Sequence, residues 1–155
     1  MTVTAAAIDN PQVSREGPQP PQARDAGETL VTALARTAHR HASHGITYIE
    51  KGAPWNQQDY PTLVDEASRI RTGLLRAGAK VGDIILFPFS ANRDFIPAFW
   101  ACMLGGYVPV PLAPIHDEDL AAAPVRRLLN ARDLLHPAIV LASPSIVGFL
   151  HGLPA

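Results

Sequence analysis

The sequence predicts an α/β protein with a parallel βαβαβ core, preceded by a helix and a short hairpin. Ile84-Ile-Leu-Phe-Pro-Phe89 is a nearly continuous apolar run, which is typical of a strand covered on both faces. Phe99–Leu112 leads from an apolar helical segment through Gly105 and Gly106 into a short strand. Glycine suits that joint because the residue just past the last helical turn usually needs positive φ. Strands and helices then alternate, as parallel sheets with right-handed crossovers require.

The helix and hairpin are expected in the first half of the chain. Leu30, Leu34 and Ala38 recur at helical spacing, which predicts a helix from Glu28 to about Ser43–Gly45. The other elements expected here are a strand at 46–50, a turn at 51–55, a returning strand at 56–58 and an amphipathic helix at about 61–77, closed by Gly78. Pro61 is tolerated in the first turn of that helix because its missing N–H would be unpaired there.

The core follows from residue 84 onward. Ser90 and Asn92 offer capping oxygens to a helix that we expect to begin near Asp94, since Pro97 then falls within its first turn. In the strand after Gly106, at 107–110, alternating prolines each remove a ladder donor, which predicts poor pairing along one edge. The later elements expected are a helix at 118–131 that is distorted at Pro124, a strand at 138–142 and a helix beginning at 144.

Composition limits the classes of function. The chain has 155 residues, enough for one domain or part of a larger one, and 47% of them are hydrophobic. With 13 basic and 14 acidic residues, nothing favours binding to nucleic acid or to an anionic membrane. Cys102 is the single cysteine, which excludes an internal disulfide and fits a reducing compartment. The sequence shows neither a signal peptide nor an apolar run of about 20 residues, so we expect a cytoplasmic, soluble protein.

Residues 1–27 differ in composition from the rest. Proline, glutamine and glycine are frequent there and large apolar side chains are nearly absent, so burial cannot offset the entropy of ordering. We therefore predict a disordered Pro/Gln-rich leader, with the folded region at 28–155. Pro18 and Pro21 have PxxP spacing, which leaves a proline-motif ligand as the alternative to a plain flexible tail.

Histidines and the cysteine are the first candidates for chemistry. His39, His41 and His44 resemble a metal cluster, but residues 39 and 41 point in nearly opposite directions at about 100° per helical residue. Neither an acidic nor a cysteine partner lies nearby in the sequence, so solvated histidines at a helix end are favoured. Cys102 lies among apolar residues, where nothing lowers the pKa of its thiol, so a buried side chain is favoured over a nucleophile.

Two polar segments could serve binding. Asp117-Glu-Asp119 starts a predicted helix, where the helix dipole stabilises acidic side chains, so no metal is needed to explain them. Arg126 and Arg127 are expected on a solvated face, where they pair with those acids. Ser90-Ala-Asn-Arg93 lies between a buried strand and a helix, a geometry suited to phosphate, with simple helix capping as the alternative. That loop lacks glycine, and the chain contains no G-x-G-x-x-G or Walker sequence. We assign no catalytic, cofactor-binding or metal-binding residue.

Three blocks in register carry a family resemblance. They are Asp59-Tyr-Pro-Thr-Leu63 with Ala67 four residues on, Leu75–Asp83 followed by Ile84-Ile-Leu, and Phe99–Leu112. In this order they resemble the amino-terminal region of the adenylate-forming (AMP-binding) enzymes: acyl-CoA synthetases, luciferases and peptide-synthetase adenylation domains. The resemblance implies a partial N-terminal subdomain of such an enzyme at 28–155.

Finer similarity is to acyl-ligase, or fatty acyl-AMP ligase-like, loading domains of peptide synthetase and polyketide synthase lines. The segments that carry it are Gly45–Glu50, Asp94–Cys102, Pro109–Leu112, Leu128-Leu-Asn130 and Pro137–Leu141. Two positions depart from the family pattern: Thr62, where an acid is common, and Val81, where a proline usually precedes Gly-Asp. Both are structural positions and leave the resemblance intact.

The resemblance also implies a parent reaction. It is ATP-dependent, Mg²⁺-dependent formation of an acyl-adenylate from a fatty or aryl acid, with transfer to a carrier-protein phosphopantetheine or to CoA. The family's Ser/Thr/Gly-rich phosphate loop, nucleoside site and catalytic lysine have no counterpart in these 155 residues, so the chain is expected to be inactive alone. Its expected partners are the remainder of the ligase or a carrier protein. The alternatives are a structural subunit that complements a separately encoded remainder, and a small nucleotide-binding α/β domain that uses Ser90–Arg93.

Overall fold

A computed structural model describes residues 28–49, 55–115, 122–137 and 139–153. The leader expected at 1–27 with its PxxP motif, most of the turn at 51–55 and the acidic segment at 117–119 lie outside these residues. The described elements are α1 (Leu30–Arg40), β1 (Gly45–Tyr48), β2 (Asn56–Asp59), α2 (Tyr60–Arg76), β3 (Ile84–Phe87), α3 (Asn92–Gly105), β4 (Val108–Pro111), α4 (Ala123–Leu135), β5 (Ile139–Val140) and α5 (Pro144–His151). None of the helices in the described residues is long and apolar enough to cross a membrane.

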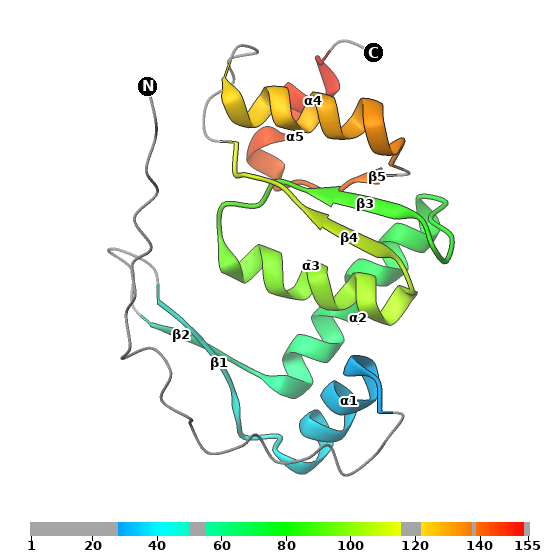
Figure 1. The fold of residues 1–155 in the computed structure, drawn as a ribbon. Coiled ribbons are helices and arrows are strands. Elements are labelled where there is room, and N and C mark those ends of the chain that lie inside the picture. Colours follow the sequence, from blue (N-terminus) through cyan, green and yellow to red (C-terminus); the bar gives the residue numbers. More distant parts are fainter. Residues whose placement is uncertain (1–27, 50–54, 116–121, 138, 154–155) are drawn as a thin grey trace, which may run out of the picture.

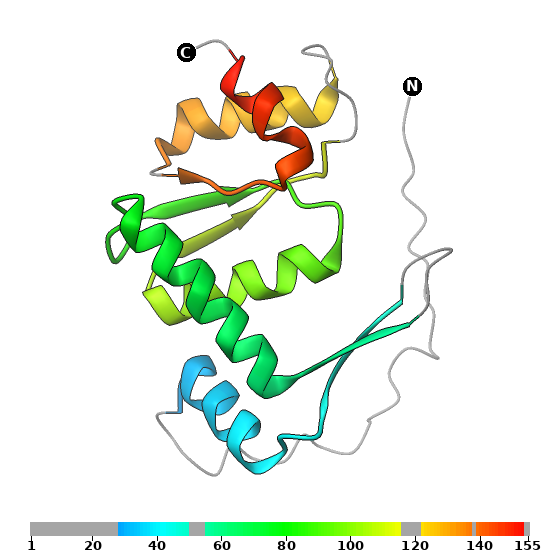
Figure 2. The same ribbon diagram turned by 180° about the vertical axis from the view of Figure 1, so that it is seen from behind.

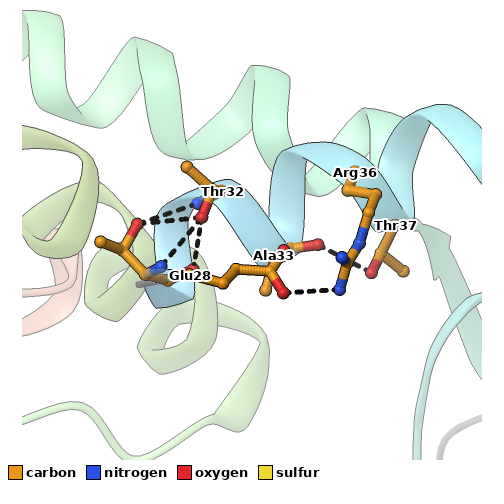
Figure 3. A network of polar contacts seen from close by, with 6 residues as sticks. Glu28, Thr32, Ala33, Arg36 and Thr37 are labelled. Carbon is orange, nitrogen blue, oxygen red and sulfur yellow. Dashed lines mark hydrogen bonds and ion pairs between the residues drawn. The ribbon is translucent and has the colours of Figure 1, made fainter. Parts of the chain in front are cut away.

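Helix α1 begins at a capping box built from two threonines. The Thr32 amide donates to Thr29 Oγ1 at 3.2 Å, and the Thr29 amide donates to Thr32 Oγ1 at 2.9 Å, so two amides of the first turn are satisfied (Figure 3). An ion pair of 2.8 Å between Glu28 and Arg36 spans the next turns. The helix ends at Arg40, earlier than expected, with His41 as its C-cap.

The predicted hairpin is confirmed. β1 and β2 pair antiparallel, with Gly45 opposite Asp59 and Tyr48 opposite Asn56. The strands approach so closely at Gly45 that a Cβ there would overlap the backbone of Gln58 and Asp59. Only glycine fits this position without movement of β2.

Helix α2 follows the hairpin directly. Asp59 Oδ1 accepts the Thr62 amide at 2.7 Å and so caps the helix, while Pro61 occupies the first turn as expected. Leu63, Ala67 and Leu74 are buried along one face, and Gly78, with φ of 96°, follows the helix end.

The parallel core is also confirmed. β3 lies between β4 and β5 and pairs with both in parallel, so the strand order is β4-β3-β5. Ile84 lies opposite Val108, and Ile85 lies opposite Ile139. β4 pairs only with β3 among the described strands, in agreement with the expectation from its two prolines.

Helices cover both faces of this sheet. Figures 1 and 2 show α4 and α5 on one face and α2 and α3 on the other. Alternate residues of β3 supply the two cores, since Ile85 and Phe87 belong to the cluster under α2 and α3, whereas Leu86 belongs to the cluster under α4 and α5. All three side chains are fully buried. The continuous apolar run at 84–89 is thereby explained.

Two expectations about prolines were wrong. Helix α3 begins at Asn92 rather than near Asp94, so Pro97 lies inside the helix and beyond its first turn. Pro97 lacks the N–H that would pair with the Arg93 carbonyl, a loss that falls on a residue exposed to solvent. Pro124 does not distort α4, because that helix begins at Ala123 and the proline occupies its first turn.

The joint between α3 and β4 takes the form that its glycines indicate. Gly106 has φ of 68° and ψ of 28°, the left-handed conformation, and caps the helix by donating to the Cys102 and Met103 carbonyls. The Gly106 carbonyl accepts the Gly82 amide at 2.8 Å, and the Val108 amide donates to the Asp83 carbonyl at 2.9 Å. The joint and the turn before β3 therefore hold each other in place at one end of the sheet.

Candidate functional site

A polar network links the hairpin to α2. The Tyr48 hydroxyl donates to Gln58 Oε1 at 2.7 Å, and Gln58 Nε2 donates to Glu66 Oε2 at 2.5 Å. Burial raises the pKa of Tyr48, the nearby Glu66 carboxylate raises it further, and Arg93 partly opposes both. Tyr48 is therefore a neutral hydrogen-bond donor near pH 7 and not a base.

Two hollows adjoin Tyr48. One is a cleft of about 520 Å³ between β1 and the start of α3, and the other is a polar pocket of about 200 Å³ between the hairpin, α2 and Arg93. The cleft is lined by Ile46, Thr47, Tyr48, Ile49, Ser90, Ala91, Asn92 and Ile96. It lies where the carboxyl end of β3 leads into α3, the side of a parallel sheet at which ligands commonly bind.

The loop Ser90–Arg93 lies at this cleft, but it does not cap the helix as expected. The N-cap residue is Ala91, and neither Ser90 nor Asn92 makes a side-chain capping bond. The first amides of α3 therefore have no side-chain acceptor from the cap, because alanine offers none. Phosphate binding at this loop stays a prediction.

The other candidate residues are separated in the fold. His39, His41 and His44 are all exposed, and His41 and His44 contact each other edge to face with ring centroids 5.5 Å apart. In the part of the chain that the structure describes, no three histidine, cysteine or acidic side chains form a group able to hold a metal. Arg126 and Arg127 are exposed on α4, as expected, while their proposed acidic partners lie outside the described residues.

Cys102 lies inside the core under α2 and α3. Its side chain is fully buried, and this burial raises the pKa of the thiol to about 11. A thiol with that pKa is almost entirely protonated near neutral pH, so Cys102 is a packing residue and not a nucleophile.

Sequence reasoning missed the Tyr48–Gln58–Glu66 network. Tyr48 and Gln58 are ten residues apart and become diagonal neighbours only through the hairpin register, in which Ile46 lies opposite Gln58. Assigning that register beforehand would have brought Tyr48 and Gln58 together. The contact with Glu66 depends additionally on how α2 leaves the hairpin.

The structural blocks behind the family resemblance are visible in the fold. In the turn before β3, Asp83 Oδ2 accepts the Lys80 amide at 2.8 Å, and Gly82 has φ of 87°. Gly82 and Asp83 therefore form a tight turn. Val81 stands where the family usually has a proline, and because its side chain is 83% exposed, the fold does not depend on which residue occupies this position. These residues form the scaffold and line neither hollow.

Comparisons with known proteins agree with these blocks. No family model matches the chain. It is 43% identical over 54 residues to a putative acyl-CoA synthetase of Caulobacter vibrioides, a match covering 35% of this chain and 9% of that protein. It is 31% identical over 84 residues to an atromentin synthetase of Paxillus involutus, covering 52% of this chain and 9% of that protein.

Solved structures give longer matches. The structure of McyG A-PCP complexed with phenylalanyl-adenylate matches 82% of this chain with a TM-score of 0.74 and 34% identity. A fatty acyl-adenylate ligase from L. pneumophila, in complex with acyl adenylate and pyrophosphate, matches 78% with a TM-score of 0.68 and 26% identity. This chain spans only 20% and 21% of those chains.

In fold and in sequence the chain is similar to one part of the adenylate-forming enzymes. Within that class, it is similar to peptide-synthetase adenylation domains and to fatty acyl-AMP ligases.

Proposed function

We propose that the chain is the amino-terminal portion of an ATP-dependent ligase that adenylates a fatty or aryl carboxylic acid. The observation that carries this proposal is the match of 82% of the chain to an adenylation domain holding an acyl-adenylate. In the parent reaction a carboxylate oxygen attacks the α-phosphorus of ATP, forming acyl-adenylate and releasing pyrophosphate. The acyl group then passes to a thiol with release of AMP.

The role proposed for residues 28–155 is that of scaffold. The glycines and prolines of the described blocks build turns and strand edges, and Cys102 is buried with a raised thiol pKa. Transfer of the adenylyl group requires stabilisation of the negative charge that develops at the α-phosphate, which Mg²⁺ and a glycine-rich phosphate loop would supply, and the sequence contains no such loop. The 155 residues alone are therefore inactive under this proposal.

The thiol acceptor proposed is a carrier-protein phosphopantetheine, with CoA as the alternative. The relative named McyG A-PCP is the structure that suggests a carrier protein. The CoA alternative is suggested by the putative acyl-CoA synthetase of C. vibrioides.

Pyrophosphate release tests this proposal. The purified chain is incubated with ATP, Mg²⁺ and a panel of fatty and aryl acids, and a complete fatty acyl-AMP ligase serves as the positive control. We expect no release above the enzyme-free background from the chain alone. Turnover that depends on one acid would refute inactivity while supporting the family reaction.

A second candidate is a small nucleotide-binding α/β domain. It is favoured by one observation, the uncapped start of α3 beside the cleft of about 520 Å³. Calorimetric titration with ATP, AMP and NAD distinguishes this candidate from the scaffold role, and the absence of binding heat with all three nucleotides rejects it. A structural subunit complementing a separately encoded remainder stays the third candidate, distinguished by co-purification with a polypeptide that holds the phosphate loop.

A further inference from the structure

Two opposite charges line one small pocket without pairing with each other. Glu66 on α2 and Arg93 at the start of α3 both line the polar pocket of about 200 Å³ beside the hairpin. Their charges act on the pKa of the Tyr48 hydroxyl in opposite directions, so both lie near it. Neither belongs to an ion pair within the described part of the chain, so the Arg93 nitrogens and the Glu66 carboxylate are more than 4.0 Å apart.

The Tyr48–Gln58–Glu66 network holds the Glu66 carboxylate by one oxygen. Tyr48 is 5% exposed and its hydroxyl donates to Gln58 Oε1, which turns the Gln58 Nε2 group toward Glu66. Gln58 Nε2 then donates to Glu66 Oε2 at 2.5 Å. Glu66 Oε1 accepts no hydrogen bond from the residues that the structure describes. The protein therefore fixes the carboxylate in place and leaves its second oxygen available to a donor on a ligand.

Arg93 supplies the positive charge of the pocket. It is exposed in the first turn of α3, and its guanidinium makes no hydrogen bond or ion pair with another described residue. The guanidinium stays charged at every physiological pH and carries five N–H donors in a planar arrangement that matches a carboxylate. Arg93 can therefore bind a carboxylate without first breaking a contact to the described fold.

The size and polarity of the pocket limit what it can hold. Its volume of about 200 Å³ lies below the roughly 300–1,000 Å³ of pockets for drug-sized ligands, which excludes a nucleotide and suits a molecule of a few heavy atoms. Asn56, Gln57 and Thr62 also line it, and no purely aliphatic side chain does. Asp59 lines it as well, but its Oδ1 is engaged by the Thr62 amide at 2.7 Å in capping α2. The ligand that fits is therefore small and hydrophilic.

We propose that this pocket binds a small zwitterion, a molecule whose ammonium and carboxylate groups are joined by a short carbon chain. The ammonium donates to Glu66 Oε1 and the carboxylate accepts from the Arg93 guanidinium, so the ligand links α2 to the start of α3. A simple anion is repelled by Glu66 and a simple cation by Arg93, whereas a zwitterion satisfies both charges. Binding requires neither ATP nor an acyl substrate, so this site goes beyond the proposed adenylation and does not depend on it.

Titration of the full ¹⁵N-labelled chain with β-alanine at pH 7, followed by NMR at the Gln58 side-chain amide, tests this site. β-Alanine carries both charges on two methylenes and is neutral overall, so it leaves the ionic strength unchanged. For so small a ligand on partly exposed charges we expect saturation with a Kd of about 1–10 mM. Propionate lacks the ammonium and ethylamine lacks the carboxylate, so each should bind at least about tenfold more weakly.

Matched substitutions make the readout specific to the two charges. Arg93→Met keeps an unbranched side chain, and Glu66→Gln keeps an acceptor for Gln58, yet each should weaken β-alanine binding at least about tenfold. Arg126→Met on α4 and Asp65→Asn on α2 remove exposed charges outside the pocket and should leave the affinity unchanged.

Three results overturn the proposal. They are shifts that never saturate in the wild type, an equal response to propionate or ethylamine, and undiminished affinity in folded Arg93→Met. Each of them means that the pocket holds solvent only. Pyrophosphate release, measured separately, decides the proposed function on its own.

Discussion

Replacing Gly106 by alanine should destabilise the protein by about 1 kcal/mol. The left-handed conformation of Gly106, with φ of 68°, costs an L-residue about 1–2 kcal/mol. The reduced freedom of the unfolded chain returns roughly 0.4–1 kcal/mol of that cost. The new Cβ would lie 3.2 Å from Val81 Cγ1, but Val81 is 83% exposed and can move, so backbone strain decides the sign.

Gly73 provides the matched control for this substitution. It lies inside α2, and a Cβ there would meet no heavy atom within 4 Å. Gly73→Ala should therefore stabilise the protein by about 0.5–1 kcal/mol, because alanine is the better helix former. The same chemical change should have opposite signs at the two positions.

Urea unfolding followed by far-ultraviolet circular dichroism measures both effects. The m-value should stay unchanged, so each change in midpoint reports stability directly. Gly106→Asn should lie between the wild type and Gly106→Ala, because asparagine tolerates the left-handed conformation better. If Gly106→Ala proves as stable as Gly73→Ala, the account of the joint between α3 and β4 is wrong.

Three further predictions concern the core, the thiol and a helix cap. Phe87→Ala should cost about 3–5 kcal/mol in urea unfolding, because the fully buried ring packs 5.5 Å from the Phe95 ring, and an unchanged midpoint would contradict the core assignment. Cys102, buried and with a thiol pKa of about 11, should resist a disulfide reagent at pH 8 until urea unfolds the chain; rapid labelling of the native protein would contradict its burial. Hydrogen bonds from the Thr62 side chain and amide lower the pKa of Asp59, so its carboxylate stabilises the fold above the ordinary carboxyl pKa, and that contribution is lost as the pH falls through the lowered pKa. The stabilities of the wild type and Asp59→Asn should therefore converge in acid, and a difference independent of pH would exclude the charge as its cause.

Sequence reasoning predicted those elements whose structure is determined by neighbouring residues in the chain. The strand at 84–87 could be predicted because every side chain in it is apolar. The end of α3 could be predicted because Gly106 is a residue type that readily adopts the left-handed conformation needed just past a helix. The start of α3 could not, because its N-cap is Ala91, which carries no capping oxygen. The buried position of Pro97 shows that packing within the fold outweighed the local preference for placing proline in the first turn.

The candidate site was less accessible to sequence reasoning than the fold. The capping bond of Asp59 joins it to Thr62, only three residues away in the sequence. The Tyr48–Gln58–Glu66 network instead requires both the register of the hairpin and the direction in which α2 leaves it. The cleft beside β1 likewise depends on how the hairpin meets the start of α3. Such sites arise from tertiary arrangement and leave no spacing pattern in the chain.

The prolines of β4 also bear on the order in which the chain can assemble as it leaves the ribosome. Ile84 and Val108 pair across 24 residues, whereas Ile85 and Ile139 pair across 54, so closing the second loop costs about 0.7 kcal/mol more. Synthesis from the amino terminus also makes β4 available before β5. The nascent sheet therefore gains first the strand whose outer edge the prolines block from pairing with neighbouring nascent chains, and β3 keeps its other edge for β5, which is made later.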